Sequence, residues 1–139
     1  MSLPPIRARL LGSVDLRLGG APIAWPRRDA RALFLFLLVT PGHRRSRDEV
    51  LDALWPGIPL ETARNSLYKS LHALRRALEP GLRDGRQSAV IVGRHDTIEI
   101  SPAANVWVDI DHFEALLREA DQRSEPRSAL SAALDLYRG

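Results

Sequence analysis

The stretch from Glu61 to Leu78 places the strongest constraint on how this chain can fold, because its apolar residues repeat at helical spacing. At about 100° per residue, these residues fall within one narrow arc of a helix. They are Ala63, Leu67, Leu71, Leu74 and Leu78. A helix of this kind must bury that face against other elements, so the rest of the chain has to supply a core.

The N-terminal residues favour a small antiparallel sheet. Apolar positions alternate over residues 7–11 and 14–18, which is the spacing of half-buried strands. Gly19-Gly20 then supplies a turn, and residues 21–25 can return as a third strand.

Two shorter helices are predicted between this sheet and the long helix. The broad apolar surface of residues 30–38 predicts a nearly engulfed helix that ends at Pro41-Gly42. Residues 46–49 have the Ser-x-x-Glu spacing of a capping box, which begins the second helix. Residues 55–59 contain two prolines and a glycine, so a turn precedes the long helix.

The residues after the long helix predict a hairpin and then two further helices. Residues 89–92 and 97–100 are rich in β-branched side chains and flank Gly93-Arg94-His95-Asp96. Asp109 and Ser124 can each cap a helix, and together these helices form a helical hairpin. The predicted fold class is therefore α+β, with a boundary at Ser101-Pro102 that divides the chain into residues 1–101 and 102–139.

Composition excludes several classes of protein. The chain has no cysteine, and its longest apolar run, Ala32 to Val39, is too short to span a membrane. No phosphate-binding GxxxxGK[ST] loop or HExxH helix occurs. The histidines lie in separate elements without metal-ligand spacing; they are His43, His72, His95 and His112. We expect a soluble cytoplasmic protein that is not an enzyme and needs no metal or cofactor.

Charge is segregated along the chain. Residues 1–100 hold sixteen Lys and Arg against ten Asp and Glu, a balance of +6, whereas residues 101–139 hold four against seven, a balance of −3. A basic half can be only a solvated surface, so the location of the charges has to decide whether it meets nucleic acid.

The exposed side of the long helix favours nucleic acid. Hydrogen-bond donors occupy the side opposite the apolar arc and one of its flanks, and no acidic residue occurs between Thr62 and Leu78. The donors opposite the arc are Asn65, Lys69, His72 and Arg76, and those on the flank are Arg64, Tyr68 and Arg75. A solvated helix usually interleaves both signs of charge, so this face indicates a partner with negative charge.

The neighbouring elements strengthen that interpretation. A short capped helix, a turn and a polar-faced second helix form a helix-turn-helix, which places its second helix in the DNA major groove. Arg44, Arg45 and Arg47 cluster at the start of the first of these helices, where free backbone amides favour a phosphate. Arg94 and His95 lie at the tip of the hairpin, where they can reach an adjacent groove or phosphate.

The ordered elements resemble the OmpR/PhoB-type winged helix. Residues 46–55 (SRDEVLDALW) and 63–78, with ARNSL at 63–67 and LRRAL at 74–78, are similar to its supporting and recognition helices. The tail, with VDIDHFEALL at 108–117 and ALDLYRG at 133–139, resembles the opening of a bacterial transcriptional activator domain. Together these segments resemble the SARP class of bacterial regulators.

The resemblance implies a winged-helix DNA-binding domain at 1–101 and the start of a TPR-like activator domain at 102–139. It also implies a transcriptional activator that binds double-stranded DNA at tandem direct repeats and contacts RNA polymerase. The recognition helix would be residues 61–78 and the wing residues 93–96. The free chain is expected to be monomeric, because no long dimerisation helix is left over. The alternative is a protein-interaction module whose basic helix binds an acidic protein.

Overall fold

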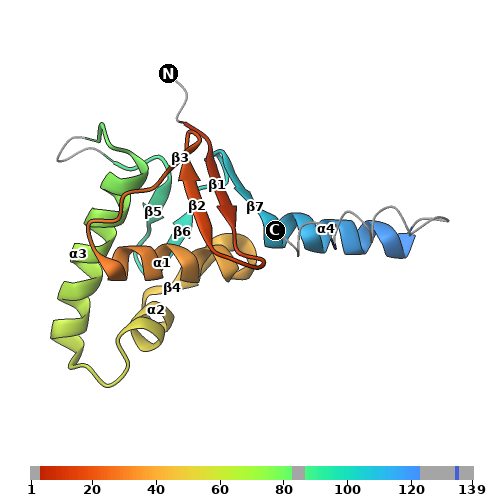
Figure 1. The fold of residues 1–139 in the computed structure, drawn as a ribbon. Coiled ribbons are helices and arrows are strands. Elements are labelled where there is room, and N and C mark those ends of the chain that lie inside the picture. The colour runs from red at the N-terminus through yellow and green to blue at the C-terminus, as the bar shows by residue number, and fades with distance from the viewer. Residues whose placement is uncertain (1–3, 83–86, 123–133, 135–139) are drawn as a thin grey trace. The chain divides into compact units, whose positions relative to one another are not determined.

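The computed structural model describes residues 4–82, 87–122 and 134 (Figure 1). Its internal contacts divide the chain into two compact units. One comprises residues 23–104, and the other comprises residues 2–22 together with 105–139. This division groups the N-terminal sheet with the tail, so the separation into residues 1–101 and 102–139 stays a prediction.

Over its described residues, the unit of residues 23–104 contains three α-helices and a three-stranded sheet. In chain order its elements are α1 (Arg28–Val39), the 3₁₀ turn η1 (Pro41–His43), β4 (Arg44–Ser46), α2 (Arg47–Leu54), α3 (Leu60–Leu78), β5 (Ile91–Gly93) and β6 (Thr97–Ile100). The predicted helices and the hairpin are confirmed, with boundaries that differ by one or two residues.

The apolar arc of α3 is buried as its spacing predicts. Ala63, Leu67, Leu71, Leu74 and Leu78 are each at most 4% exposed, and α3 packs along α1. Ser70 and Ala73 are buried as well. The Ser70 hydroxyl donates to the Ser66 carbonyl at 2.8 Å, which satisfies its hydrogen bond within the helix.

The predicted capping box begins α2. Ser46 Oγ accepts from the Glu49 backbone N–H at 3.1 Å, and the Glu49 carboxylate accepts from the Ser46 backbone N–H at 3.4 Å. These contacts lower the pKa of Glu49, mainly through the Ser46 hydroxyl and backbone N–H. The box therefore fixes the start of α2 directly after β4.

Strand β4 was not predicted. It pairs antiparallel with β6, so that Arg44 lies opposite Glu99 and Arg45 opposite Ile98, and the sheet order is β4-β6-β5. Arg44 and Arg45, predicted to lie at a helix start, therefore lie in a strand, and only Arg47 begins α2. A three-residue polar strand has no hydrophobic alternation to reveal it, because its pairing uses backbone groups alone.

The second unit contains a four-stranded sheet of order β3-β2-β1-β7. Its strands are β1 (Ile6–Arg9), β2 (Asp15–Leu18), β3 (Ala21–Pro22) and β7 (Val106–Val108). Gly19 and Gly20 have φ of 59° and 87°, the left-handed conformations of a tight hairpin turn between β2 and β3. The predicted antiparallel strands β1, β2 and β3 are confirmed, and β7, which was not predicted, joins their sheet parallel to β1.

Helix α4 (Asp109–Gln122) follows β7 directly (Figure 1). The Asp109 carboxylate is buried and accepts hydrogen bonds from the backbone N–H groups of Leu10 and Leu11 at 2.9–3.0 Å. It therefore joins the end of β1 to the start of α4. The second helix of the predicted helical hairpin lies outside the described residues, except Leu134. No helix within the described ranges has the length and apolar character needed to cross a membrane.

Candidate nucleic-acid interface

The polar side of α3 is open to solvent. Tyr68 is 72% exposed, and the other exposed side chains on this side are Arg64, Asn65, Lys69, His72 and Arg76. Arg76 Nε lies 3.1 Å from His72 Nε2, one helical turn earlier. The side chains predicted to meet a partner therefore share one accessible surface, with Arg75 as the half-buried exception.

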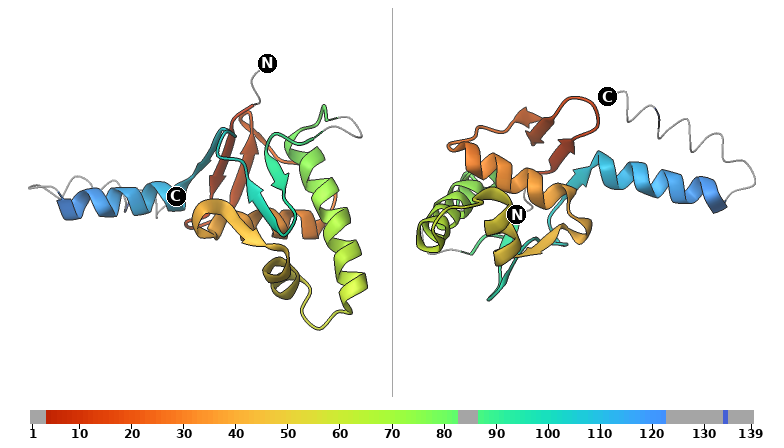
Figure 2. Two further views of the ribbon diagram at one scale, coloured as in Figure 1. Left: turned by 180° about the vertical axis from the view of Figure 1, so that it is seen from behind. Right: turned by 90° about the horizontal axis from the view of Figure 1, so that it is seen from below.

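One flank of this surface is a groove of about 600 Å³ between α3, the start of α2 and the β5–β6 turn. Figure 2 shows the turn of this hairpin directed toward α2, with α3 alongside. The groove is lined by Ser46, Arg47, Asp48, Leu51, Arg64, Leu67, Tyr68, Leu71, Arg75, His95 and Asp96. Residues from three predicted segments, the two helices and the hairpin turn, thus meet at one concave surface.

Arg47 and Arg75 hold the hairpin against the helices. The Arg47 backbone N–H donates to the Asp96 carbonyl at 2.8 Å, and its guanidinium lies 3.4 Å from the Arg94 carbonyl. Arg75 Nε donates to the Ile91 carbonyl at 3.3 Å. A Cβ on Gly93 would lie 2.9 Å from Arg47 Nη2 and 3.1 Å from Arg75 Nη2. The glycine therefore leaves room for both guanidinium groups.

The two guanidinium groups repel each other. Burial lowers the pKa of Arg75, and the charge of Arg47 lowers it further, while Glu79 opposes the change. Arginine side chains in proteins stay protonated even so, and the site therefore holds two cations at close range. An anion placed between them would relieve this repulsion and gain charge-assisted hydrogen bonds.

Two of the predicted contact residues form ion pairs with glutamates of the protein. Arg94 forms an ion pair with Glu99 at 2.9 Å, and Arg45 forms one with Glu49 at 2.8 Å. Arg44 and His95 are exposed, and no hydrogen bond or ion pair engages either side chain among the described residues. Arg44 and His95 are thus more available to a partner than Arg45 and Arg94.

Comparison with known proteins identifies the fold. The chain is similar to EmbR of Mycobacterium tuberculosis, solved in complex with a low-affinity phosphopeptide, with a TM-score of 0.72 and 24% sequence identity. The chain has a winged-helix fold. The match covers all of this chain and 37% of the EmbR chain, so our sequence spans little more than a third of that protein. No protein-family model matches, and neither does any curated protein sequence.

In this fold α2 and α3 form the helix-turn-helix, and the β5–β6 hairpin is the wing. Sequence reasoning located both, including the exposed face of α3. It did not find that Arg75 is half-buried and bonded to the wing, because its helical position differs little from that of exposed Arg64. Only the packing of β5 beside α3 separates the two.

A second groove lies along the other flank of α3 and is lined in part by residues that were not predicted as contacts. Trp25 and Arg27 precede α1 and line this groove together with Lys69 and Arg76. Arg27 donates to the Asp29 carboxylate through Nε at 2.9 Å and Nη2 at 2.8 Å. The signal in the sequence is a basic pair, Arg27-Arg28, directly after Trp25-Pro26 at a helix start.

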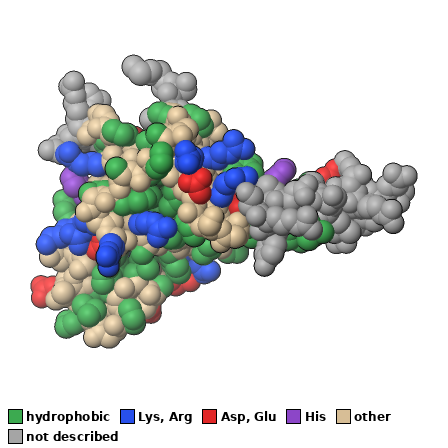
Figure 3. Space-filling model, in the orientation of Figure 1, with side chains coloured by type: hydrophobic (Ala, Val, Ile, Leu, Met, Phe, Trp, Pro, Cys, Tyr) green, Lys and Arg blue, Asp and Glu red, His purple; other side chains and the backbone are tan. Residues whose placement is uncertain are grey.

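On the face drawn in Figure 3, Lys and Arg side chains form several groups rather than one cluster, with apolar and other surface between them. This arrangement suits an extended anionic partner, which can contact several separate cations.

The Arg27–Asp29 pair predicts a pH dependence of stability. The hydrogen bonds that Arg27 donates to the Asp29 carboxylate are the main reason why the pKa of Asp29 is lowered. A lowered folded-state pKa stabilises the protein above the unfolded-state pKa of about 3.9, and this contribution is lost as pH falls through the folded-state value. Asp29→Asn should therefore reduce the free energy of unfolding near neutral pH but not in acid. Urea unfolding at both pH values, with the exposed Asp52→Asn as control, measures the difference; equal losses in acid and at neutrality would contradict the assignment.

Proposed function

We propose that this chain is the DNA-binding part of a sequence-specific transcriptional regulator. Helix α3, the predicted recognition helix 61–78, would enter the major groove, and the wing near residues 93–96 would contact the adjacent backbone. The major groove is about 12 Å wide and admits one α-helix.

The observation that carries this proposal is the surface on both sides of α3. The exposed face has no acidic residue from Thr62 onward, and the Arg47–Arg75 guanidinium pair lies beside it at the wing. Contacts to DNA phosphates fix the orientation of a recognition helix on the duplex. A phosphate between Arg47 and Arg75 would separate two like charges that the protein alone leaves in repulsion.

The exposed side chains then divide into two roles. Asn65 and Lys69 lie in the N-terminal half of α3, the part of a recognition helix that contacts base edges, where amides favour adenine and cations favour guanine. His72 would donate to a base or a phosphate. The other proposed contacts are to phosphates, made by Arg64, Tyr68, Arg75 and Arg76 on α3, Arg44, Arg45 and Arg47 around the start of α2, and Arg94 and His95 in the wing.

The sequence resemblance adds proposals about the whole protein. The SARP class implies an activator that binds tandem direct repeats and contacts RNA polymerase, with residues 102–139 as the start of its activator domain. The fold shared with EmbR, a SARP-family regulator, supports this placement. The free chain should be a monomer, with copies arranged head to tail on DNA.

A competition experiment separates this function from the alternative, an acidic protein partner. The chain should retain a labelled duplex on a filter. Unlabelled duplex should displace the labelled one at a far lower concentration than polyglutamate, when both competitors are counted per negative charge. A duplex presents phosphates at fixed spacing, whereas polyglutamate offers only flexible negative charge. Equal displacement by both polymers would favour the acidic-protein alternative and contradict the proposal.

A further inference from the structure

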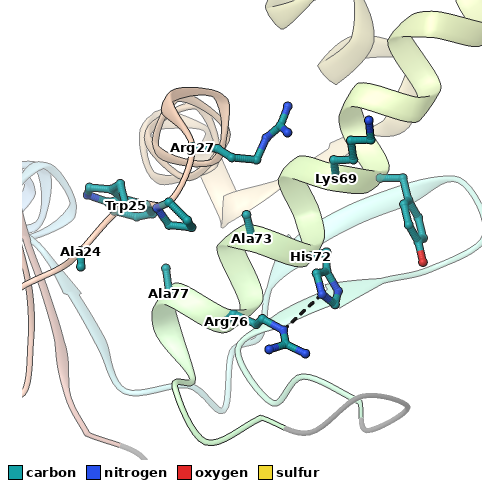
Figure 4. Close-up of a pocket in the computed structure, with 10 residues that line it drawn as sticks. Ala24, Trp25, Arg27, Lys69, His72, Ala73, Arg76 and Ala77 are labelled. Atoms are coloured by element: carbon teal, nitrogen blue, oxygen red, sulfur yellow. Dashed lines mark hydrogen bonds between the residues drawn. The ribbon is translucent and has the colours of Figure 1, made fainter.

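A second groove, of about 690 Å³, runs along the flank of α3 opposite the wing (Figure 4). Its volume lies within the range of roughly 300 to 1,000 Å³ that small-molecule sites occupy. It is lined by Ala24, Trp25, Pro26, Arg27, Tyr68, Lys69, His72, Ala73, Arg76 and Ala77. All of these residues belong to the unit of residues 23–104, so the groove does not depend on the other unit.

The floor of the groove is apolar and fixed. The Trp25 ring packs against buried Phe34, with 5.9 Å between their centroids and a 41° interplanar angle. The half-buried indole thus contacts the core and also lines the groove beside Pro26. Ala73 and Ala77 of α3 lie opposite (Figure 4). Because both are small, a gap is left between α3 and the Trp25-Pro26 segment that suits a flat apolar group.

The rim is cationic, and none of the described residues that line the groove is acidic. Lys69 and Arg27 lie on one side of it in Figure 4, and the His72–Arg76 pair lies on another. Arg27 donates to the Asp29 carboxylate through Nε and Nη2, and these bonds orient its guanidinium. The third nitrogen, Nη1, takes no part in them. No hydrogen bond or ion pair engages the Lys69 ammonium among the described residues.

We propose that this groove binds a small aromatic carboxylate. Its ring would lie between Trp25-Pro26 and the two alanines, and its carboxylate would accept hydrogen bonds from Lys69 Nζ and Arg27 Nη1. A DNA phosphate would use the cations but would leave the indole floor without a partner. An aromatic acid uses both, because ring stacking and charge-assisted hydrogen bonds act on the same molecule.

The site would regulate DNA binding, and this part of the proposal rests on the proposed function. Lys69, His72 and Arg76 line the groove and also belong to the proposed DNA surface. A bound carboxylate would occupy Lys69 and neutralise positive charge beside the duplex. The ligand and DNA should therefore each weaken the binding of the other by the same factor, as linkage requires.

The test uses naphthoate as the probe and neutral naphthamide as its matched control. Proton–nitrogen spectra of the whole chain contain three indole signals, from Trp25, Trp55 and Trp107. Naphthoate should shift the Trp25 signal, identified with Trp25→Phe, in a saturable way and leave the other two in place. Naphthamide should bind at least about tenfold more weakly, because it lacks the charge that Lys69 and Arg27 recognise.

Two variants locate the site. Ala77→Leu fills the floor and should weaken naphthoate binding by roughly tenfold or more, because overpacking removes the space for the ring. Arg64→Ala removes a charge from the wing side of the same helix and should leave naphthoate affinity within about twofold. If Ala77→Leu does not fold, as its own spectrum would reveal, Lys69→Gln gives the same test through the carboxylate.

Equal binding of naphthoate and naphthamide, or shifts at all three indoles, would overturn the proposal. A Trp25 shift caused by polyglutamate and not by naphthoate would instead make the groove a peptide-docking surface, which also overturns it. The regulatory step is measured separately, as displacement of a labelled duplex by naphthoate. If the chain binds naphthoate but no duplex, the proposed function fails and the carboxylate site stands; duplex binding without naphthoate binding gives the reverse.

Discussion

Replacing Asn65 or Lys69 by alanine should weaken binding to a preferred duplex by roughly 1 to 3 kcal/mol for each residue, and should relax sequence preference. Both side chains are exposed on the N-terminal half of α3. A base contact distinguishes sequences, so its loss should fall on the preferred duplex far more than on a scrambled one. The measurement is the affinity of each variant for both duplexes, after the preferred site has been selected from a random library.

Arg44→Ala is the matched control. Arg44 lies in β4, away from the proposed base-reading positions, and its side chain is exposed. Loss of one phosphate contact should weaken binding to both duplexes alike. It should also make the slope of log association constant against log salt concentration shallower by about one unit. If Asn65→Ala and Lys69→Ala also weaken both duplexes equally, α3 does not read bases and its placement in the major groove is wrong.

Asp109→Ala should lower the free energy of unfolding by roughly 2 to 4 kcal/mol. The buried carboxylate accepts from the backbone N–H groups of both Leu10 and Leu11, and alanine would leave these donors without a partner. Urea unfolding measures the loss, and hydrogen exchange at the Leu10 and Leu11 amides should accelerate.

Glu114→Ala is the control for this prediction, because it removes an exposed carboxylate from the same helix. It should change stability by no more than about 0.5 kcal/mol. Equal, small effects of the two substitutions would mean that Asp109 does not hold β1 to α4.

Local patterns predicted the helices of the winged-helix unit well. The spacing of the apolar residues in α3 reports burial directly, and the Ser46–Glu49 capping box uses contacts only three residues apart. Such features depend on neighbours in the sequence, so the sequence is sufficient to find them.

Long-range pairings were missed. β4 pairs with β6 through backbone groups, although Arg44 and Glu99 are 55 positions apart in the numbering of the chain. β7 follows the expected boundary at Ser101-Pro102 yet pairs with β1. Nothing in the composition of a three-residue strand specifies its partner, because that choice depends on which sheet edge is open.

The candidate site divides in the same way. The exposed face of α3 follows from its spacing, whereas the half-buried position of Arg75 depends on β5. The groove beside Trp25 depends on a segment before α1 that lies next to α3 only in the folded chain. The Trp25 floor and Lys69 of the rim are about 45 positions apart in the sequence, so the local Trp25-Pro26-Arg27 signal does not reveal that they share a groove.

The most direct test of the proposed function is the salt dependence of duplex binding. If the basic surface neutralises about six phosphates, the logarithm of the association constant should fall against the logarithm of salt concentration with a slope near −5. Arg47→Gln should make that slope shallower by about one unit, because it removes half of the guanidinium pair at the wing. A slope near zero, unchanged by Arg47→Gln, would show that this surface does not bind the DNA backbone and would contradict the account.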